Sequence, residues 1–339
     1  MIIVLKPRIS KRDERAVLNE IRKLGYTPHV MRGVARTVIG AIGDELTHAN
    51  LETLTAQFPR AVESVMPIQK RYKLVSREAH PSNSTVRVRE HVIGGKKLHV
   101  MAGPCSVESE KQLLTCAEAV VKAGATVLRG GAFKPRTSPY EFQGLGEKGL
   151  KLLDKARRIT GLAVVTELLS EQHVDLVAEY TDIIQIGARN AQNFQLLIAA
   201  AKTGKPILLK RGLSMRIEEW LLAGEYVLAN ENPNLMFCER GIRTFETYTR
   251  NTLDLSAIPI IKREAHSPVV IDPSQGVGRA DLVTTMCQGA VAMGADALLI
   301  EVHPNPAEAW SDGAQQLSLD GFGKLMKELK PFIAAAGRE

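Results

Sequence analysis

The sequence predicts an α/β protein, a (β/α)8 TIM barrel preceded by a small α+β ferredoxin-like domain of order βαββαβ. After residue 98, eight short β-branched runs alternate with segments of helical period, while the first 68 residues follow the ferredoxin-like order. The length of 339 residues suits one barrel-sized domain and one small one. We therefore expect a ferredoxin-like domain at 1–68, a linker at 69–97 and a catalytic barrel at 98–339.

The first domain is expected to contain four strands and two helices. Gly25 closes the first helix and Gly43 lies in a turn, because glycine tolerates the left-handed backbone that such positions need. The linker mixes Lys, Arg, Pro, Ser, Asn and Gly, with short strands expected at 84–88 and 91–93. The expected elements of the first domain are strand 1–6, helix 11–25, strands 27–32 and 36–43, helix 50–59 and strand 61–68.

The barrel is predicted because eight expected strands are each followed by a helical segment. Helical period is clear, for example, at 109–124, 147–161 and 279–295. The eight expected strands lie at 98–103, 125–131, 162–167, 182–187, 206–212, 235–241, 268–274 and 297–304.

Composition indicates a globular cytoplasmic protein. Hydrophobic residues make up 45% of the chain and charged residues 24%, and no apolar stretch approaches the roughly 18 residues that span a bilayer. At the N-terminus, "MIIVLKPRISKRDER" places its apolar run before its charges, the reverse of a secretory signal. The cysteines lack paired zinc spacing and disulfide density, which fits a reducing compartment; they are Cys105, Cys116, Cys238 and Cys287.

The formal net charge of +7 raises the question of a nucleic-acid partner. However, the basic clusters "KPRISKRDER", "QKRYK" and "GGKK" are short, and aromatic residues are only 5% of the chain, so stacking platforms are scarce. We expect no nucleic-acid partner, because anionic small substrates explain the excess charge better.

Polar residues follow all eight expected barrel strands, and cations are frequent among them. In a TIM barrel the active site forms at the carboxyl ends of the strands. A single cation after a strand is usually an ordinary solvent-exposed loop charge. Several cations directed into the same opening of the barrel repel one another unless an anion lies among them. The set therefore indicates two phosphorylated ligands, or a phosphate and a carboxylate. Its members are Arg129, Lys134, Arg136, Arg189, Lys210 and Arg240, with Thr137 beside them.

A second group suggests a divalent metal. Cys105 follows the first strand in a Gly-Pro turn, Glu301 ends the eighth strand, and Asp312 lies in the following loop. A thiolate and two carboxylates would together bind one cation, although Cys105 alone could equally be a small buried packing residue.

Several long motifs carry a resemblance to a known family. They are, in order along the chain, "AGPCSVES", "RGGAFKPRTSPYEFQGLG", "QIGARNAQNF", "LLKRG", "CERGIRTFE" and "EVHPNPAEAWSDGAQQL". Together these motifs resemble 3-deoxy-D-arabino-heptulosonate 7-phosphate (DAHP) synthase. The likeness is to the microbial branch with an N-terminal ferredoxin-like domain and covers essentially the whole chain. The "KPRTS" segment differs from the "KANRSS"-like segment of the sister 3-deoxy-octulosonate 8-phosphate synthases.

The resemblance implies condensation of phosphoenolpyruvate with erythrose 4-phosphate to give DAHP and phosphate, the first step of the shikimate pathway. Arg136 and Thr137 would bind the phosphate of erythrose 4-phosphate, Lys134 would transfer a proton, and a divalent metal, Mn2+ or similar, would polarise the aldehyde. It also implies an aromatic amino acid effector at the first domain, and we expect a homo-oligomer, a dimer or a tetramer. The residues expected to hold phosphoenolpyruvate are Arg129, Lys134, Arg189, Lys210 and Arg240.

One position departs from the family pattern. The family has a metal-binding histidine in the loop after strand seven, where this chain reads "DPSQGVG" with Gln275. We expect weaker metal binding, because an amide oxygen is a weaker ligand than imidazole. Two alternatives stay open: a paralogue that uses another aldose phosphate, and a non-catalytic regulatory barrel.

Overall fold

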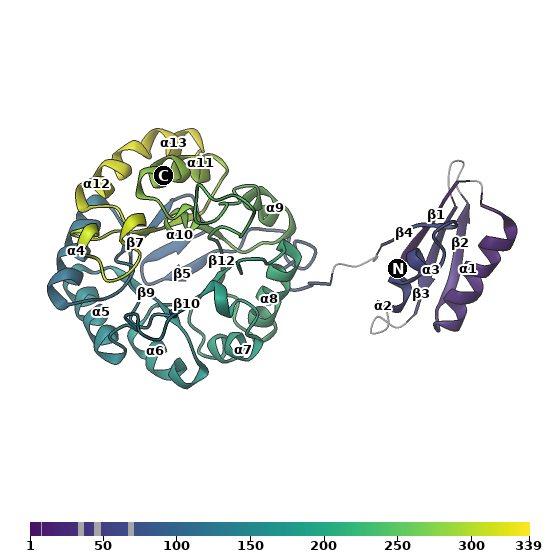
Figure 1. The fold of residues 1–339 in the computed structure, drawn as a ribbon, viewed down its shortest axis with the longest axis horizontal. Coiled ribbons are helices and arrows are strands. Elements are labelled where there is room, and N and C mark those ends of the chain that lie inside the picture. Colours follow the sequence, from purple (N-terminus) through teal and green to yellow (C-terminus); the bar gives the residue numbers. More distant parts are fainter. Residues whose placement is uncertain (8, 33–36, 44–48, 67–70) are drawn as a thin grey trace. The chain divides into compact units, whose positions relative to one another are not determined.

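The computed structural model describes residues 1–339 except 8, 33–36, 44–48 and 67–70. The chain divides into two compact units, Met1–Arg71 and Tyr72–Glu339. Figure 1 traces both units in sequence colours. Within the described residues, no helix has both the length and the apolar character needed to cross a membrane.

The first unit has the expected ferredoxin-like order. Its four antiparallel strands lie in the order β2-β3-β1-β4, so β1 is central and pairs with both β3 and β4. The helix expected at 50–59 is two short helices, and the strand expected at 61–68 ends at Met66, beyond which lie residues outside the described part. The elements are β1 (Ile2–Leu5), α1 (Lys11–Lys23), β2 (Thr27–Arg32), β3 (Thr37–Ile42), α2 (Ala49–Glu52), α3 (Leu54–Gln57) and β4 (Val62–Met66).

The second unit is built on a closed eight-stranded parallel barrel, which confirms the predicted TIM fold (Figure 1). The strands pair around the ring, and the last strand, β14, closes it against the first, β7. They are β7 (His99–Gly103), β8 (Val127–Arg129), β9 (Ala163–Leu168), β10 (Ile183–Ile186), β11 (Ile207–Lys210), β12 (Leu235–Glu239), β13 (Val269–Ile271) and β14 (Ala297–Glu301).

Helices surround the barrel because each strand presents alternate apolar side chains to the outside, where amphipathic helices cover them. The periodicity at 109–124 forms α4, which is capped by Ser109 and ends at left-handed Gly124. The helices are α4 (Glu110–Ala123), α5 (Glu147–Thr160), α6 (Val174–Tyr180), α7 (Phe194–Lys202), α8 (Ile217–Ala229), α9 (Ala257–Glu264), α10 (Pro273–Val277), α11 (Ala280–Ala292), α12 (Leu319–Glu328) and α13 (Lys330–Ala335).

A hairpin packs with the barrel interior. It consists of β5 (Val86–Val88) and β6 (His91–Ile93), close to the two short strands expected in the linker. Its residues Val86, Val88 and Ile93 belong to one buried cluster with inward-facing residues of the barrel strands. His99, the first residue of β7, also contacts it, since Nε2 lies 3.1 Å from the Val92 carbonyl oxygen. The hairpin therefore lies at the amino-terminal end of the strands, opposite the end where the candidate residues are found.

The barrel unit begins earlier than the expected residue 98. The Glu225 carboxylate of α8 accepts hydrogen bonds from the backbone N–H groups of Lys73, Leu74 and Val75, at 2.7 to 3.0 Å. Residues 73–75 of the expected linker are thus fixed to the barrel by a residue about 150 positions later.

Candidate active site

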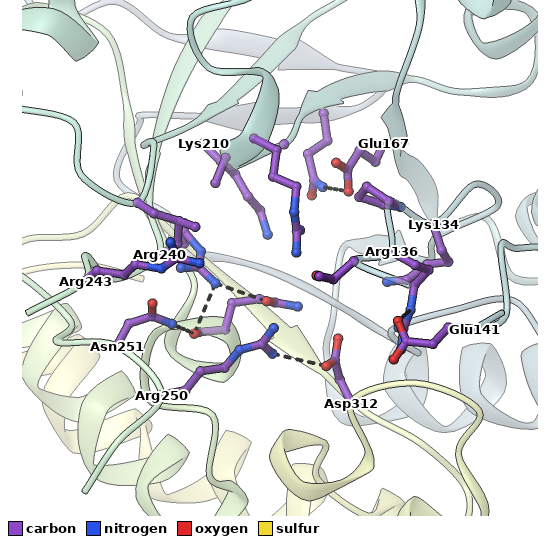
Figure 2. A pocket seen from close by; sticks show the side chains of 18 of the residues that line it. Lys134, Arg136, Glu141, Glu167, Lys210, Arg240, Arg243, Arg250, Asn251 and Asp312 are labelled. Atoms are coloured by element: carbon purple, nitrogen blue, oxygen red, sulfur yellow. Dashed lines mark hydrogen bonds and ion pairs between the residues drawn. The ribbon is translucent and has the colours of Figure 1, made fainter. Parts of the chain in front are cut away.

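A pocket of about 350 Å3 opens at the carboxyl ends of the barrel strands. The structure brings the candidates together: the expected cations and Thr137 line this pocket, as do Gln275 and Asp312. Figure 2 shows several of these side chains directed into one space. The cationic side chains in its wall are Arg129, Lys134, Arg136, Arg189, Lys210, Arg240, Arg243 and Arg250, and the acidic ones are Glu141, Glu167 and Asp312.

Barrel geometry explains this gathering. Arg129 and Lys210 are the last residues of β8 and β11, and Arg240 follows the last residue of β12 directly. Because all eight strands are parallel, their carboxyl ends meet at one mouth, so residues far apart in sequence share a single wall.

Two of the cations have buried carboxylate partners, so the cations repel one another less than the sequence suggested. Lys210 Nζ lies 2.5 Å from Asp272 Oδ2, and Arg129 Nη1 lies 2.8 Å from Glu301 Oε1, with all four side chains buried. Buried carboxylates therefore offset part of the positive charge, which the positions of the cations in the sequence did not indicate.

Arg129 still has hydrogen-bonding capacity toward a ligand. Its Nη1 also donates to the Pro104 carbonyl oxygen at 3.0 Å, while its buried Nε has no hydrogen-bond partner among the described residues. Burial acts to lower the Arg129 pKa, but the neighbouring Glu301 carboxylate outweighs it and raises the pKa. A permanently charged guanidinium with an unused donor fits an anionic ligand.

Lys134 lies at the junction of the anion site and the thiol. Its buried Nζ is 3.0 Å from Cys105 Sγ and 3.1 Å from the Cys105 carbonyl oxygen. Burial alone lowers the Lys134 pKa, yet Cys105 and Glu301 raise it overall. Lys134 is therefore an ammonium ion, able to donate a proton.

Arg136 lies on the loop between β8 and α5 and already has an anionic neighbour. Its Nε donates to Glu141 Oε2 at 3.0 Å, and this hydrogen bond is the first cause of the raised Arg136 pKa. Arg189 follows β10 and is exposed, so its guanidinium is accessible from the pocket.

The thiol and two carboxylates predicted as metal ligands do converge. One ligand atom each from Cys105, Glu301 and Asp312 lies within 4.8 Å of the others, and Cys105 Sγ donates to Asp312 Oδ2 at 3.1 Å. Burial, followed by the charge of Glu301, raises the pKa of the Cys105 thiol to about 12. One sulfur and two carboxylate oxygens of this spacing fit a divalent cation, which would displace the thiol proton.

Gln275 lies between this trio and the cation cluster. Its Nε2 donates to Glu301 Oε1 at 3.0 Å, and its Oε1 accepts from Arg240 Nη2 at 3.2 Å. Burial lowers the Arg240 pKa. The other Glu301 oxygen accepts from Gln315 Nε2 at 2.6 Å.

Several pocket residues were not identified from the sequence. Glu141 lies three residues beyond the "KPRTS" segment, and Arg243 and Arg250 lie within the long loop between β12 and α9. Arg250 Nη1 bonds Asp312 Oδ1 at 3.1 Å (Figure 2). The signal that could have found the two arginines is the length of that loop, since long loops at a barrel mouth commonly serve the site.

Comparisons with known proteins agree with this architecture. Residues 78–335 match the DAHP synthetase I family, and residues 1–70 match the DAHP synthase ferredoxin-like domain. A phospho-2-dehydro-3-deoxyheptonate aldolase from Thermotoga maritima is 49% identical over 339 residues, covering 99% of each chain. A 2-dehydro-3-deoxyphosphooctonate aldolase from Caulobacter vibrioides is 34% identical over 274 residues, which cover 75% of this chain and 92% of that protein.

Two solved structures extend the agreement to three dimensions. The crystal structure of the Thermotoga maritima DAHP synthase has a TM-score of 0.87 at 48% identity and covers 100% of this chain and 98% of that one. A truncated form of the Thermotoga maritima enzyme has a TM-score of 0.75 at 49% identity, over 79% of this chain and 98% of that one.

A closed barrel whose mouth gathers cations beside a thiol and two carboxylates defines an anion-binding (β/α)8 enzyme. The chain belongs to the DAHP synthetase I family and carries its ferredoxin-like domain. It is an aldolase-type transferase, of the class that joins phosphoenolpyruvate to an aldose phosphate.

Proposed function

We propose that this enzyme is a DAHP synthase that condenses phosphoenolpyruvate with erythrose 4-phosphate, releasing DAHP and inorganic phosphate. The observation that carries the proposal is a cation-lined pocket that adjoins the group Cys105, Glu301 and Asp312, of which Asp312 lines the pocket. The cations suffice for two phosphates and one carboxylate, even after two of them are paired with buried acids.

Phosphoenolpyruvate would bind among the cations at the carboxyl ends of the strands. Arg189, Lys210 and Arg240 would hold one of its anionic groups, and Arg129 with Lys134 the other. Fixed cations in a buried site need no reorganisation during reaction, so they stabilise developing negative charge effectively.

The phosphate of erythrose 4-phosphate would bind Arg136 and Thr137, which lie together on the loop after β8. In doing so it would take the place of the Glu141 carboxylate on Arg136 Nε. This arrangement would direct the aldehyde toward Lys134 and the group Cys105, Glu301 and Asp312.

In the reaction, C3 of phosphoenolpyruvate forms a bond to the aldehyde carbon, water adds at C2, and the C2–O bond to phosphate breaks. A divalent metal, Mn2+ or similar, held by Cys105, Glu301 and Asp312 would supply a Lewis acid for the aldehyde oxygen. Lys134, an ammonium ion 3.0 Å from Cys105 Sγ, would donate the proton that this oxygen gains.

A direct assay tests the proposal. Purified protein of defined metal content would be incubated with both substrates, while loss of phosphoenolpyruvate absorbance and release of phosphate are followed. Equal rates of the two signals, dependent on erythrose 4-phosphate, are expected. Phosphate release without the aldose phosphate, or no turnover with any added divalent metal, would contradict it.

A paralogue using a five-carbon aldose phosphate is the second candidate. It is favoured by the 34% identity to an octonate aldolase over three-quarters of the chain. A comparison of kcat/KM for erythrose 4-phosphate and arabinose 5-phosphate separates the two, and we expect the four-carbon substrate to be preferred.

The first unit would regulate the barrel by binding an aromatic amino acid, because every candidate catalytic residue lies in the second unit.

We further propose that the protein is a cytoplasmic homo-oligomer, either a dimer or a tetramer.

A further inference from the structure

Gln275 is held firmly at the point where the family has a histidine. Its backbone N–H donates to Asp272 Oδ1 at 2.9 Å, as part of the cap of α10. Its carbonyl oxygen accepts from Asn251 Nδ2 at 2.9 Å and from Arg240 Nη2 at 3.3 Å, bonds that Figure 2 draws as dashed lines. The main chain of Gln275 is therefore anchored through both its N–H and its carbonyl oxygen, which fixes where the side chain begins.

The polarity of the neighbours fixes the orientation of the Gln275 amide. Arg240 can only donate, so the amide oxygen faces its Nη2 at 3.2 Å. Glu301, ionised beside Arg129, can only accept, so the amide nitrogen faces its Oε1 at 3.0 Å. A flipped amide would oppose donor to donor and acceptor to acceptor, and both unfavourable contacts would be partly buried. The one atom of Gln275 that could ligate a cation therefore points toward Arg240.

We propose that Gln275 is a bridge between the substrate-anion site and the metal site, and not a metal ligand. It would position Arg240 for the substrate and Glu301 for the metal, which would then have three protein ligands, Cys105, Glu301 and Asp312. This inference rests on the proposed function, since it takes the trio to be a metal site.

The bridge has a separate consequence for each side. On the anion side, loss of the amide leaves Arg240 without its side-chain acceptor, so binding of phosphoenolpyruvate should weaken even when no metal is present. On the metal side, loss of the amide removes a donor to Glu301 but no ligand, so the number of water molecules on the ion should stay the same.

The test uses full-length protein and the variant Gln275→Met, which keeps the length of the side chain but neither donates nor ligates as an amide does. Calorimetric titration of the chelated protein with phosphoenolpyruvate should give a dissociation constant raised about three- to tenfold. Water-proton relaxation of the Mn2+-loaded protein should count the same number of bound waters as in the unaltered chain. Gln275→His, which adds a ligand nitrogen, should lose one bound water and hold Mn2+ more tightly.

Gln195→Met is the matched control, because the same change on an exposed position of α7 should alter neither measurement. One additional bound water in Gln275→Met would make Gln275 a ligand and overturn the proposal. Unchanged phosphoenolpyruvate affinity in that variant would equally overturn it, by removing the link to Arg240. If the unaltered chain binds Mn2+ no better than Cys105→Ser does, the metal site of the proposed function fails instead, while the titration of chelated protein still tests the Arg240 side.

Discussion

At the scale of single residues, Lys134 combines burial with a charged side chain at the wall of the pocket. Its ammonium group is buried with Cys105 Sγ and the Cys105 carbonyl oxygen as its hydrogen-bond partners. Burial acts to lower its pKa, but Cys105 and Glu301 raise it overall, so the amine stays protonated. Under the proposed function it would therefore donate a proton and not accept one.

We expect Lys134→Met to lower kcat at least about 100-fold, since general acid catalysis typically contributes that much or more. Methionine retains most of the apolar stem, so circular dichroism and the melting temperature should indicate an intact fold. The measurement is steady-state turnover at saturating substrates and metal. Lys122→Met, on an exposed position of α4, serves as the control, and near-normal turnover in Lys134→Met would remove this residue from the mechanism.

At the scale of elements, two loops must be held together for the trio to form. Cys105 follows β7 and Asp312 lies beyond β14, and the buried Glu108 joins these loops. One Glu108 oxygen accepts from the Trp310 backbone N–H at 2.9 Å, and the other lies 3.2 Å from His303 Nε2. His303 Nδ1 accepts from the Asn305 N–H, so Nε2 carries the proton and donates to Glu108.

We expect Glu108→Gln to weaken Mn2+ binding about 10- to 100-fold, the range typical of residues that orient metal ligands. A glutamine can accept from only one of the two donors, and its own NH2 group would oppose the other. A competition titration with a chelator measures the effect, with Glu118→Gln on an exposed position of α4 as control. Equal Mn2+ affinity in the two variants would argue that Glu108 does not position the site.

The opposite end of the barrel carries a buried neutral histidine. His99 accepts from the Thr126 hydroxyl at Nδ1, 3.1 Å away, and donates from Nε2 to the Val92 carbonyl oxygen. Burial, followed by the charges of His91 and Lys97, lowers the His99 pKa to about 4. Between that value and its ordinary pKa of about 6.5 the unfolded chain binds a proton that the fold does not.

The free energy of unfolding should therefore fall as the pH drops from about 6.5 to about 4, and this contribution should level off below that window. His99→Gln, which can still donate and accept but does not titrate, should flatten this part of the profile. Urea unfolding followed by tryptophan fluorescence reports on the barrel, because both tryptophans, Trp220 and Trp310, lie in it. His29→Gln, at an exposed position of the first unit, should leave the slope unchanged; an unaltered slope in His99→Gln would refute the assignment.

At the scale of the whole molecule, the candidate site lies within one of the two units. The pocket lining and the group Cys105, Glu301 and Asp312 belong to the second unit, and the anchoring of residues 73–75 by Glu225 lies near its start. The first unit has its own buried core, which includes Ile3, Val17 and Ile39, and supplies none of the described pocket wall.

A chain that starts at Tyr72 should retain turnover and lose inhibition by tyrosine or phenylalanine. The full-length chain, assayed in parallel with each amino acid at millimolar concentration, provides the comparison. If the full-length enzyme responds to neither, the regulatory role fails, and if the shortened chain is inactive, the first unit contributes to catalysis or assembly.

The sequence by itself determined the fold and which residues lie at the carboxyl ends of the barrel strands. Strand and helix follow from local periodicity, and the parallel barrel then requires that residues such as Arg129 and Lys210 share one end. The tertiary structure alone decided how those residues pair. Arg129 meets Glu301 across 172 positions and Lys210 meets Asp272 across 62, and the amide of Gln275 is oriented between Arg240 and Glu301. Such partners depend on the distance between side chains of different strands, and no local pattern encodes that distance, so the charge balance of the site and the orientation of Gln275 emerged only from the folded chain.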